Sequence, residues 1–307
     1  MTFLDVLCRG FRDGGLAVIA ISFASAQYVH ASENDASNSR SGGTSSFSTV
    51  RDIAFSVPGG IRSLDLYLPA IRNAAQVKPC IIWFHGGGGD KADMREVHIC
   101  ETLAVAGYLC ASVNFGPDGV TKENILACKS AVRFLRTKAK TYKIDPDKIA
   151  VGGASLGGYL ALMVAFTSGN SEFEIKSDYP VVSGRVCAVL DFYGPTDFTT
   201  IPEKQRPGTT KVMPVSAYNQ MAPIFSPVTY VTDDSPPVLI LHGAADSNVD
   251  YHQAVEMADA LTRLHVAHEF LLLQNVGHGF DLVDWNGHPL PTDLRPVVLR
   301  FLDQHIR

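Results

Sequence analysis

The sequence contains 307 residues, of which 46% are hydrophobic and 19% are charged, and it has a formal net charge of −5 and a pI near 6.0. This is enough apolar material for one large core, so we expect a single folded domain. The acidic balance offers no broad basic surface and argues against a nucleic-acid partner, whereas it is compatible with a sugar polymer.

The first 26 residues have the parts of a secretory signal peptide. Arg9 and Arg12 precede an apolar run at 14–23, and the sequence Ala-Ser-Ala at 24–26 fits a cleavage site. The apolar run is too short to cross a membrane comfortably. We therefore predict a secreted or periplasmic protein with no stable membrane insertion after cleavage. The alternative is an amphipathic or buried amino-terminal helix.

Residues 27–49 are rich in Ser, Asn and Gly, which is typical of an unstructured linker. The folded domain is therefore expected at 50–307. After two antiparallel strands near 51–57 and 63–68, predicted strands and helices alternate to the end of the chain. This alternation predicts an α/β protein with a mostly parallel, doubly wound sheet and flanking helices.

Apolar patterns place the elements of this domain. Further strands are expected at 80–84, 108–115, 149–151, 186–190, 238–241 and 268–273. A helix is expected at 93–106, where Asp93 and Glu96 form a capping pair and Gly107 ends the helix. The next helix has one apolar face that we expect to pack on the sheet. That face is formed by Ile125, Cys128, Val132, Leu135 and Ala139.

Seven prolines interrupt the stretch between residues 199 and 237. We interpret it as a small irregular cap insertion that flanks the substrate, and a long surface connection is the alternative. Four aromatic residues in or before this stretch either offer surfaces to a sugar or phenolic acyl group or fill core space. They are Tyr193, Tyr218, Phe225 and Tyr230.

The sequence Gly153-Ala154-Ser155-Leu156-Gly157 has the G-x-S-x-G pattern between an apolar strand and a helix-forming run. A serine on such a tight turn needs neighbours without side chains, so that the chain can bend and the hydroxyl can stand clear of the sheet. The start of the helix also favours negative charge, which develops when an ester carbonyl is attacked. Ser155 is therefore the predicted nucleophile.

The glycine run His85-Gly86-Gly87-Gly88-Gly89 follows the strand at 80–84. In this arrangement, backbone N–H groups of the glycines and of the residue after the nucleophile form an oxyanion hole. We assign the donors to Gly87, Gly88 and Leu156. A phosphate-binding loop would end in Gly-Lys-Ser/Thr, but here the lysine at 91 is followed by alanine.

A serine nucleophile needs an imidazole that accepts its proton. Nine of the ten histidines lie in the targeting region, in the glycine run, in the carboxyl-terminal segment, or within or at the ends of predicted elements. His278 remains, flanked by glycines in the loop after the strand at 268–273, where flanking glycines allow close approach of another segment. His278 is therefore the predicted base.

A carboxylate should orient the imidazole and stabilise its positive charge. Asp246 lies just past the strand at 238–241 and is our choice. Asp197, which follows the preceding strand, is the second candidate, with a turn or cap role as its alternative. Asp250 is expected to begin or cap the helix that starts near residue 251.

The chain order Ser155, Asp246, His278 is the order of the α/β-hydrolase fold. From about residue 50 to its end, the chain resembles α/β-hydrolase esterases. It is most similar to the secreted bacterial carbohydrate esterases that include the bifunctional acetyl xylan and feruloyl esterases. The segments that carry this resemblance are 83–88, 144–149, 153–158, 192–197, 241–246 and 277–280. Such enzymes usually have an aromatic residue after the glycines, where this chain has Gly89 and Asp90.

These residues predict a serine carboxylic ester hydrolase that forms an acyl-enzyme, and the resemblance implies acetyl or feruloyl esters of plant polysaccharides as substrates. A general short-chain carboxylesterase or lipase-like enzyme is the main alternative. A peptidase similar to prolyl oligopeptidase is another, although the chain has no room for a propeller domain. A non-catalytic binding protein with this fold is the third, but it would have lost one of the three residues.

No cofactor and no metal site are predicted, because the cysteines lack C-x-x-C spacing and the histidines are dispersed. Signal cleavage would remove Cys8 and leave five cysteines, an odd number that cannot all pair within one chain. We expect them to be small buried apolar residues, with a single disulfide as the alternative. They are Cys80, Cys100, Cys110, Cys128 and Cys187.

Overall fold

The computed structural model describes residues 47–70, 76–116, 119–174, 179, 182–206 and 214–306. The predicted signal peptide and most of the predicted linker lie outside these residues. Strand β1 (Phe47–Val57) begins three residues before the domain boundary expected at residue 50. The earlier start has a packing reason, because Phe47 pairs with Pro69 of β2 (Gly60–Pro69) and its ring contacts that of Tyr67.

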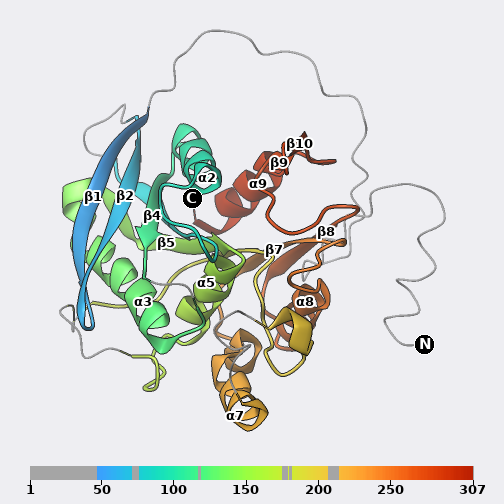
Figure 1. Cartoon of the computed structure of the whole chain (residues 1–307). Coiled ribbons are helices and arrows are strands. Elements are labelled where there is room, and N and C mark those ends of the chain that lie inside the picture. The colour runs from blue at the N-terminus through green and yellow to red at the C-terminus, as the bar shows by residue number, and fades with distance from the viewer. Residues whose placement is uncertain are drawn as a thin grey trace.

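An eight-stranded sheet in the order β1-β2-β4-β3-β5-β6-β7-β8 forms the centre of the domain (Figure 1). Its remaining strands are β3 (Lys78–Phe84), β4 (Leu109–Asn114), β5 (Ile144–Ala154), β6 (Val189–Phe192), β7 (Val238–Gly243) and β8 (His268–Leu273). Strands β1 and β2 are antiparallel to their neighbours, and all pairs from β4 to β8 are parallel. The predicted mostly parallel, doubly wound sheet is therefore confirmed.

Helices cover both faces of this sheet (Figure 1). One face packs against α2 (Met94–Val105) and α9 (Arg295–Ile306), and the other against α3 (Lys122–Thr137), α5 (Leu156–Phe166) and α8 (His252–Arg263). Successive residues of β3 alternate between the two cores: Ile82 and Phe84 belong to one, whereas Ile81 and Trp83 belong to the other. Such a strand is buried on both faces, which explains its continuous apolar sequence.

The smaller elements connect or extend this framework. They are α4 (Ala139–Tyr142), the 3₁₀ helices η1 (Glu203–Gln205) and η2 (Pro227–Tyr230), α7 (Val215–Phe225), and the short strands β9 (Asp284–Trp285) and β10 (His288–Pro289). Four of the five residues expected on the apolar face of α3 are fully buried, namely Ile125, Cys128, Val132 and Leu135. The fifth, Ala139, lies beyond the end of α3, in α4, and is partly buried.

Residues 199–206 and 214–237, which we call the cap segment, are more ordered than their prolines predict. Helix α7 has 11 residues, begins directly after Pro214 and contains Pro223 near its end. A proline before the first turn or near the last one disturbs a helix less than a proline at its centre. Figure 1 shows α7 projecting from the body of the domain near α5 and α8.

The expected capping pair of α2 is wrong. Asp93 precedes the helix but makes no side-chain capping hydrogen bond, and its carboxylate instead accepts from the backbone N–H of Asp90 at 3.2 Å. Glu96 turns inward and is 2% exposed. A pattern of residue types cannot tell a carboxylate that closes its own helix from one that is used by a neighbouring strand.

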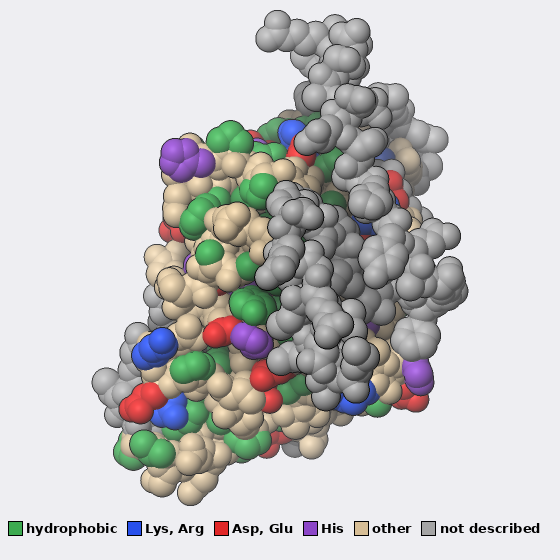
Figure 2. Space-filling model, turned by 90° about the vertical axis from the view of Figure 1, so that its right-hand side faces the viewer, with side chains coloured by type: hydrophobic (Ala, Val, Ile, Leu, Met, Phe, Trp, Pro, Cys, Tyr) green, Lys and Arg blue, Asp and Glu red, His purple; other side chains and the backbone are tan. Residues whose placement is uncertain are grey.

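On the part of the described surface that is visible in Figure 2, hydrophobic side chains are scattered among polar ones, and charges of both signs are interspersed. The five cysteines at 80–187 are free thiols, and all but Cys187 are buried. Among the described residues, no helix is long and apolar enough to cross a membrane.

Candidate active site

Ser155 lies between β5 and α5, at a turn that we call the elbow (residues 153–158). Its backbone has φ 56° and ψ −117°, a conformation that is strained for any residue with a side chain. The Ser155 N–H donates to the carbonyl of Phe192 on β6 at 2.8 Å, which fixes the strained residue to the neighbouring strand. The predicted strand-to-helix turn around this serine is therefore present.

The glycines of the elbow have a steric cause. A Cβ atom at Gly157 would lie 2.0 Å from the carbonyl oxygen of Phe84, and one at Gly153 would lie 2.4 Å from the carbonyl carbon of Gly157. The end of β3 therefore touches the first turn of α5 with no side chain between them. This contact brings the glycine run after β3 next to the serine.

His278 connects Ser155 and Asp246. Its Nε2 atom lies 2.9 Å from Ser155 Oγ, and its Nδ1 atom lies 2.7 Å from Asp246 Oδ2. An ionised carboxylate can only accept, so Nδ1 carries the proton and Nε2 is free to accept from the serine hydroxyl. The three predicted residues, which are up to 123 positions apart in sequence, thus form one chain of hydrogen bonds.

The carboxylate of Asp246 is surrounded by donors. Burial opposes its ionisation, but hydrogen bonds from His242 and His278 outweigh burial and hold the pKa of this carboxyl well below its ordinary value. The other oxygen accepts from the backbone N–H groups of Asn248 at 2.8 Å and Val249 at 2.9 Å. Asp246 therefore remains a negative charge beneath the imidazole, with no freedom to rotate away.

The loop that carries His278 is held by Trp285, which the sequence did not single out. The Trp285 indole N–H donates to the carbonyl of His278 at 3.0 Å, and a Cβ at Gly277 would lie 2.7 Å from the same ring. On another side the ring of Tyr193 contacts the imidazole edge-on, with centroids 4.8 Å apart. The imidazole is thus fixed in orientation, while 18% of its side chain stays exposed.

The glycine run turns back beside the nucleophile. Gly89 N–H donates to the carbonyl of Gly86 at 3.3 Å, and Gly88 has a φ of +75°, the value that a type II turn requires at its third residue. A Cβ at Gly86 would lie 3.9 Å from Ser155 Cβ. Gly87, Gly88 and Leu156, the predicted oxyanion donors, therefore belong to two segments that meet at Ser155.

The other candidate acids have different partners. Asp197 accepts from the backbone N–H and the hydroxyl of Thr199, as a turn residue does. Asp250 bonds the backbone N–H and ring of His252 at the start of α8. Of the aromatic residues, Tyr193 and Tyr218 are buried and fill core space. No group of three metal-ligating side chains occurs among the residues that the structure describes.

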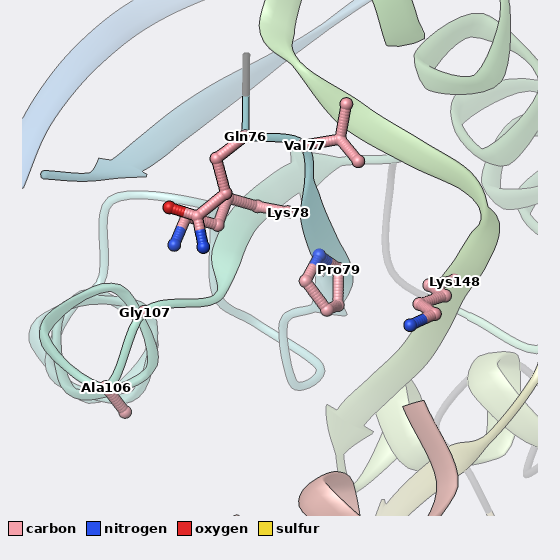
Figure 3. Close-up of a pocket in the computed structure, with 7 residues that line it drawn as sticks. All are labelled: Gln76, Val77, Lys78, Pro79, Ala106, Gly107 and Lys148. Atoms are coloured by element: carbon pink, nitrogen blue, oxygen red, sulfur yellow. The ribbon is translucent and has the colours of Figure 1, made fainter. Parts of the chain in front are cut away.

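A shallow cavity of about 280 Å³ lies near the amino-terminal ends of β3 and β5, away from the strand ends that carry Ser155, Asp246 and His278 (Figure 3). Its lining comes from the amino-terminal parts of β3 and β5 and from the turn after α2. The lining residues are Gln76, Val77, Lys78, Pro79, Ala106, Gly107 and Lys148. Ser155, Asp246 and His278 lie at or beyond the carboxyl ends of strands, where open α/β sheets bind ligands, so this cavity is separate from the candidate active site.

Comparison with known proteins places the chain in a family. The BD-FAE family model matches residues 64–261, well over half of the chain. LipM of Mycobacterium tuberculosis, a probable carboxylic ester hydrolase, is 28% identical over 244 residues, which are 76% of this chain and 56% of that protein. Esterase LipC of the same organism is 30% identical over 67% of this chain and 54% of its own length. The chain thus spans about half the length of these relatives.

Solved structures share the fold. A truncated carbohydrate esterase from gut microbiota has a TM-score of 0.71 and 23% identity, covering 85% of this chain and 96% of that chain. An acetyl ester-xyloside bifunctional hydrolase from Caldicellulosiruptor lactoaceticus has a TM-score of 0.68 and 23% identity, covering 80% of this chain and 89% of that chain. Taken with the family match, the chain belongs to the BD-FAE family and has the α/β-hydrolase fold.

Proposed function

We propose that the protein is a serine carboxylic ester hydrolase in which Ser155 is the nucleophile, His278 the general base and Asp246 the orienting acid. The observation that carries the proposal is the hydrogen-bond chain from Ser155 Oγ through His278 to Asp246, with links of 2.9 and 2.7 Å. This arrangement lets the imidazole accept the serine proton while a buried carboxylate stabilises the resulting positive charge.

The reaction follows from this geometry in two steps. Ser155 Oγ attacks the ester carbonyl as His278 takes its proton, and the N–H groups of Gly87, Gly88 and Leu156 stabilise the negative oxygen. The alcohol leaves with the proton from His278, which leaves an acyl-serine. A water molecule then gives a proton to His278 as it attacks the acyl group, and His278 returns this proton to Ser155 Oγ as the acid leaves.

For the substrate, we propose acetyl or feruloyl esters of plant polysaccharides. Membership of the BD-FAE family supports this choice, as do neighbours named carbohydrate esterase and acetyl ester-xyloside hydrolase. Export through the predicted signal peptide at 1–26 would bring the protein to such polymers. A general short-chain carboxylesterase is the second candidate, because the mycobacterial relatives are named esterase or carboxylic ester hydrolase.

The chemistry is tested with p-nitrophenyl acetate and a labelled fluorophosphonate. We expect wild type to hydrolyse the ester and take up the label on Ser155, and Ser155→Ala to lose both. Full activity in Ser155→Ala would refute the assignment. A matched pair of ester and amide substrates separates the two classes, because an esterase cleaves only the ester, whereas a peptidase also cleaves the amide.

The substrate class is tested with the purified mature protein. Acetylated xylan, methyl ferulate and p-nitrophenyl esters of rising chain length are compared by kcat/KM. Preference for the first two supports the polysaccharide proposal, whereas comparable or better rates on simple short-chain esters favour the general carboxylesterase. Amino-terminal sequencing of the exported protein tests cleavage after Ala26, and an uncleaved cytoplasmic chain would contradict export.

A further inference from the structure

Glu96 is a buried carboxylate behind the glycine run. It lies in the first turn of α2 and is 2% exposed. One oxygen accepts from the indole N–H of Trp83 at 2.5 Å, and the other faces the backbone N–H of Gly86 at 3.4 Å. The side chain therefore connects α2 to the last residues of β3 and to the first glycine of the run.

A carboxylate in such a place needs a reason, because taking a charge out of water costs several kcal/mol unless hydrogen bonds compensate. Burial raises the pKa of Glu96, and the donors Trp83 and Gly86 act in the opposite direction. The positive end of the α2 dipole also favours a negative charge in the first turn. Both donors lie on the segment that leads to the predicted oxyanion donors.

Lys91 is a second anchor at the other end of the run. Its Nζ atom lies 2.6 Å from the fully buried Asp65 on β2 and 2.9 Å from Asp52 on β1. Its backbone carbonyl accepts from the hydroxyl of Ser112 on β4 at 2.9 Å. The chain is therefore tied to α2 at the start of the glycine run and to the sheet two residues after its end.

Between these anchors the backbone has little stiffness of its own. Residues 86–89 are all glycine, the residue type with the greatest conformational freedom. An oxyanion hole works only if its donors are already 2.7–3.1 Å from the place where the negative oxygen forms. Contacts from outside the run must help to hold it, and the two anchors supply such contacts at its two ends.

We propose that Glu96 and Lys91 are positioning residues that hold the glycine run in the conformation that stabilises the oxyanion. The inference rests on the proposed function, since it assigns a cause to the geometry of that same site. Glu96 acts on the Gly86 end and Lys91 on the opposite end. Neither residue touches the substrate, so their loss weakens stabilisation of the transition state without removing nucleophile or base.

The first test is Glu96→Gln, which keeps the size and shape of the side chain but replaces one accepting oxygen by an NH₂ group. That NH₂ group then faces an N–H donor and cannot accept from it. We expect kcat on p-nitrophenyl acetate to fall about 10- to 100-fold, less than the 10²–10³ for outright loss of a donor, with KM within about twofold. Affinity for a trifluoromethyl ketone, which forms a tetrahedral adduct with the serine, should fall by the same factor as kcat/KM.

Glu101→Gln is the matched control, because it removes the same charge from the same helix away from the run. It should leave kcat and inhibitor affinity unchanged. If Glu96→Gln folds and keeps wild-type kcat and inhibitor affinity, or if it changes only KM, the proposal is overturned. An equal loss in Glu101→Gln would also overturn it, because the effect would then be one of helix charge.

Lys91→Met keeps the proposal testable if Glu96→Gln does not fold, since it releases the other end of the run. A drop in kcat and in inhibitor affinity, per folded molecule, supports the proposal, and unchanged values contradict it. Failure of the proposed function would look different. In that case the wild type itself would neither hydrolyse esters nor react with the fluorophosphonate.

Discussion

The elbow and the cap segment flank the same sheet but are built in opposite ways. In the elbow, a Cβ at Gly158 would lie 2.4 Å from Asp191 Oδ1, so no additional atom fits. In the cap segment, α7 leaves Val215 57% and Ile224 45% exposed. The elbow is packed between the sheet and its helices with only Ser155 and Leu156 partly exposed, whereas α7 leaves apolar side chains in solvent.

The difference shows where strain can be maintained. Ser155 persists at φ 56° because its N–H bonds to β6 and its glycine neighbours pack against β3. Strained backbone survives only where the surroundings leave no alternative. The cap segment shows no such strain, and it is held by several ordinary hydrogen bonds, among them that of the Tyr218 hydroxyl, which donates to the carbonyl of Phe198 at 2.6 Å. Substitutions should therefore affect chemistry and stability strongly near the elbow and weakly in the cap segment.

The largest effect is expected for Asp246→Asn. The amide is no longer a negative acceptor, so the imidazole loses the partner that holds its productive tautomer, and kcat should fall about 10⁴-fold, as in other triads. The melting temperature should show that the fold is retained. A loss below about tenfold on p-nitrophenyl acetate would contradict the proposed role of Asp246.

The next effect is expected for Gly157→Ala. The new methyl group would meet the Phe84 carbonyl at 2.0 Å, so the free energy of unfolding should fall by about 3 kcal/mol and activity should be lost with it. Denaturant unfolding measures the first quantity. Ser216→Ala, on the exposed side of α7, is the control and should stay within about 0.5 kcal/mol of wild type. If both variants lost the same free energy of unfolding, the contrast between the elbow and the cap segment would be contradicted.

Asp191, which packs beneath the elbow, should make the free energy of unfolding depend on pH. Burial raises its pKa to about 7, and Oδ2 has no hydrogen-bond partner among the residues that the structure describes, although Oδ1 accepts from the Gly194 N–H. Below about pH 4 this carboxyl is protonated in both folded and unfolded chains. As the pH rises towards 7 the unfolded chain releases its proton first, so this group makes the folded state progressively less stable.

Asp191→Asn removes that titration. Its free energy of unfolding should rise relative to wild type by about 1–3 kcal/mol between pH 5 and pH 8, with the change complete slightly above pH 7. Denaturant melts at several pH values measure the difference. A difference that is constant across this range would show that the Asp191 carboxyl does not titrate as its burial requires.

The smallest effect is expected for Tyr218→Phe in the cap segment. It removes the hydrogen bond to the Phe198 carbonyl, which should lower the free energy of unfolding by about 1 kcal/mol. The kcat on p-nitrophenyl acetate should not change, because the small ester needs no contact with α7. A large loss of kcat would show that the cap segment is coupled to the elbow.

Much of the candidate site could be predicted from single segments. Ser155, Asp246 and His278 each follow an apolar strand, and parallel strands end at one edge of a sheet. The glycines of the elbow are also a local signal, because a tight turn is a property of a few consecutive residues. These features need no knowledge of what packs against them.

Glu96 and Trp285 could not be predicted in this way. The spacing of Glu96 from Asp93 fits a capping box and predicts a helix cap, whereas its hydrogen-bond partners are Trp83 on β3 and Gly86 in the glycine run. Trp285 is recognisable only through its bond to the His278 carbonyl. Helix α7 formed despite its prolines, because they lie at its start and near its end.

Period, turn chemistry and chain order are local properties, so the residues alone predict the alternation of strands and helices, the two glycine-rich turns and the three side chains proposed for catalysis. What holds those groups in place depends on packing between segments. The strained serine, the buried Glu96 and the low pKa of Asp246 each depend on partners from distant segments, which meet only when both faces of the sheet are covered.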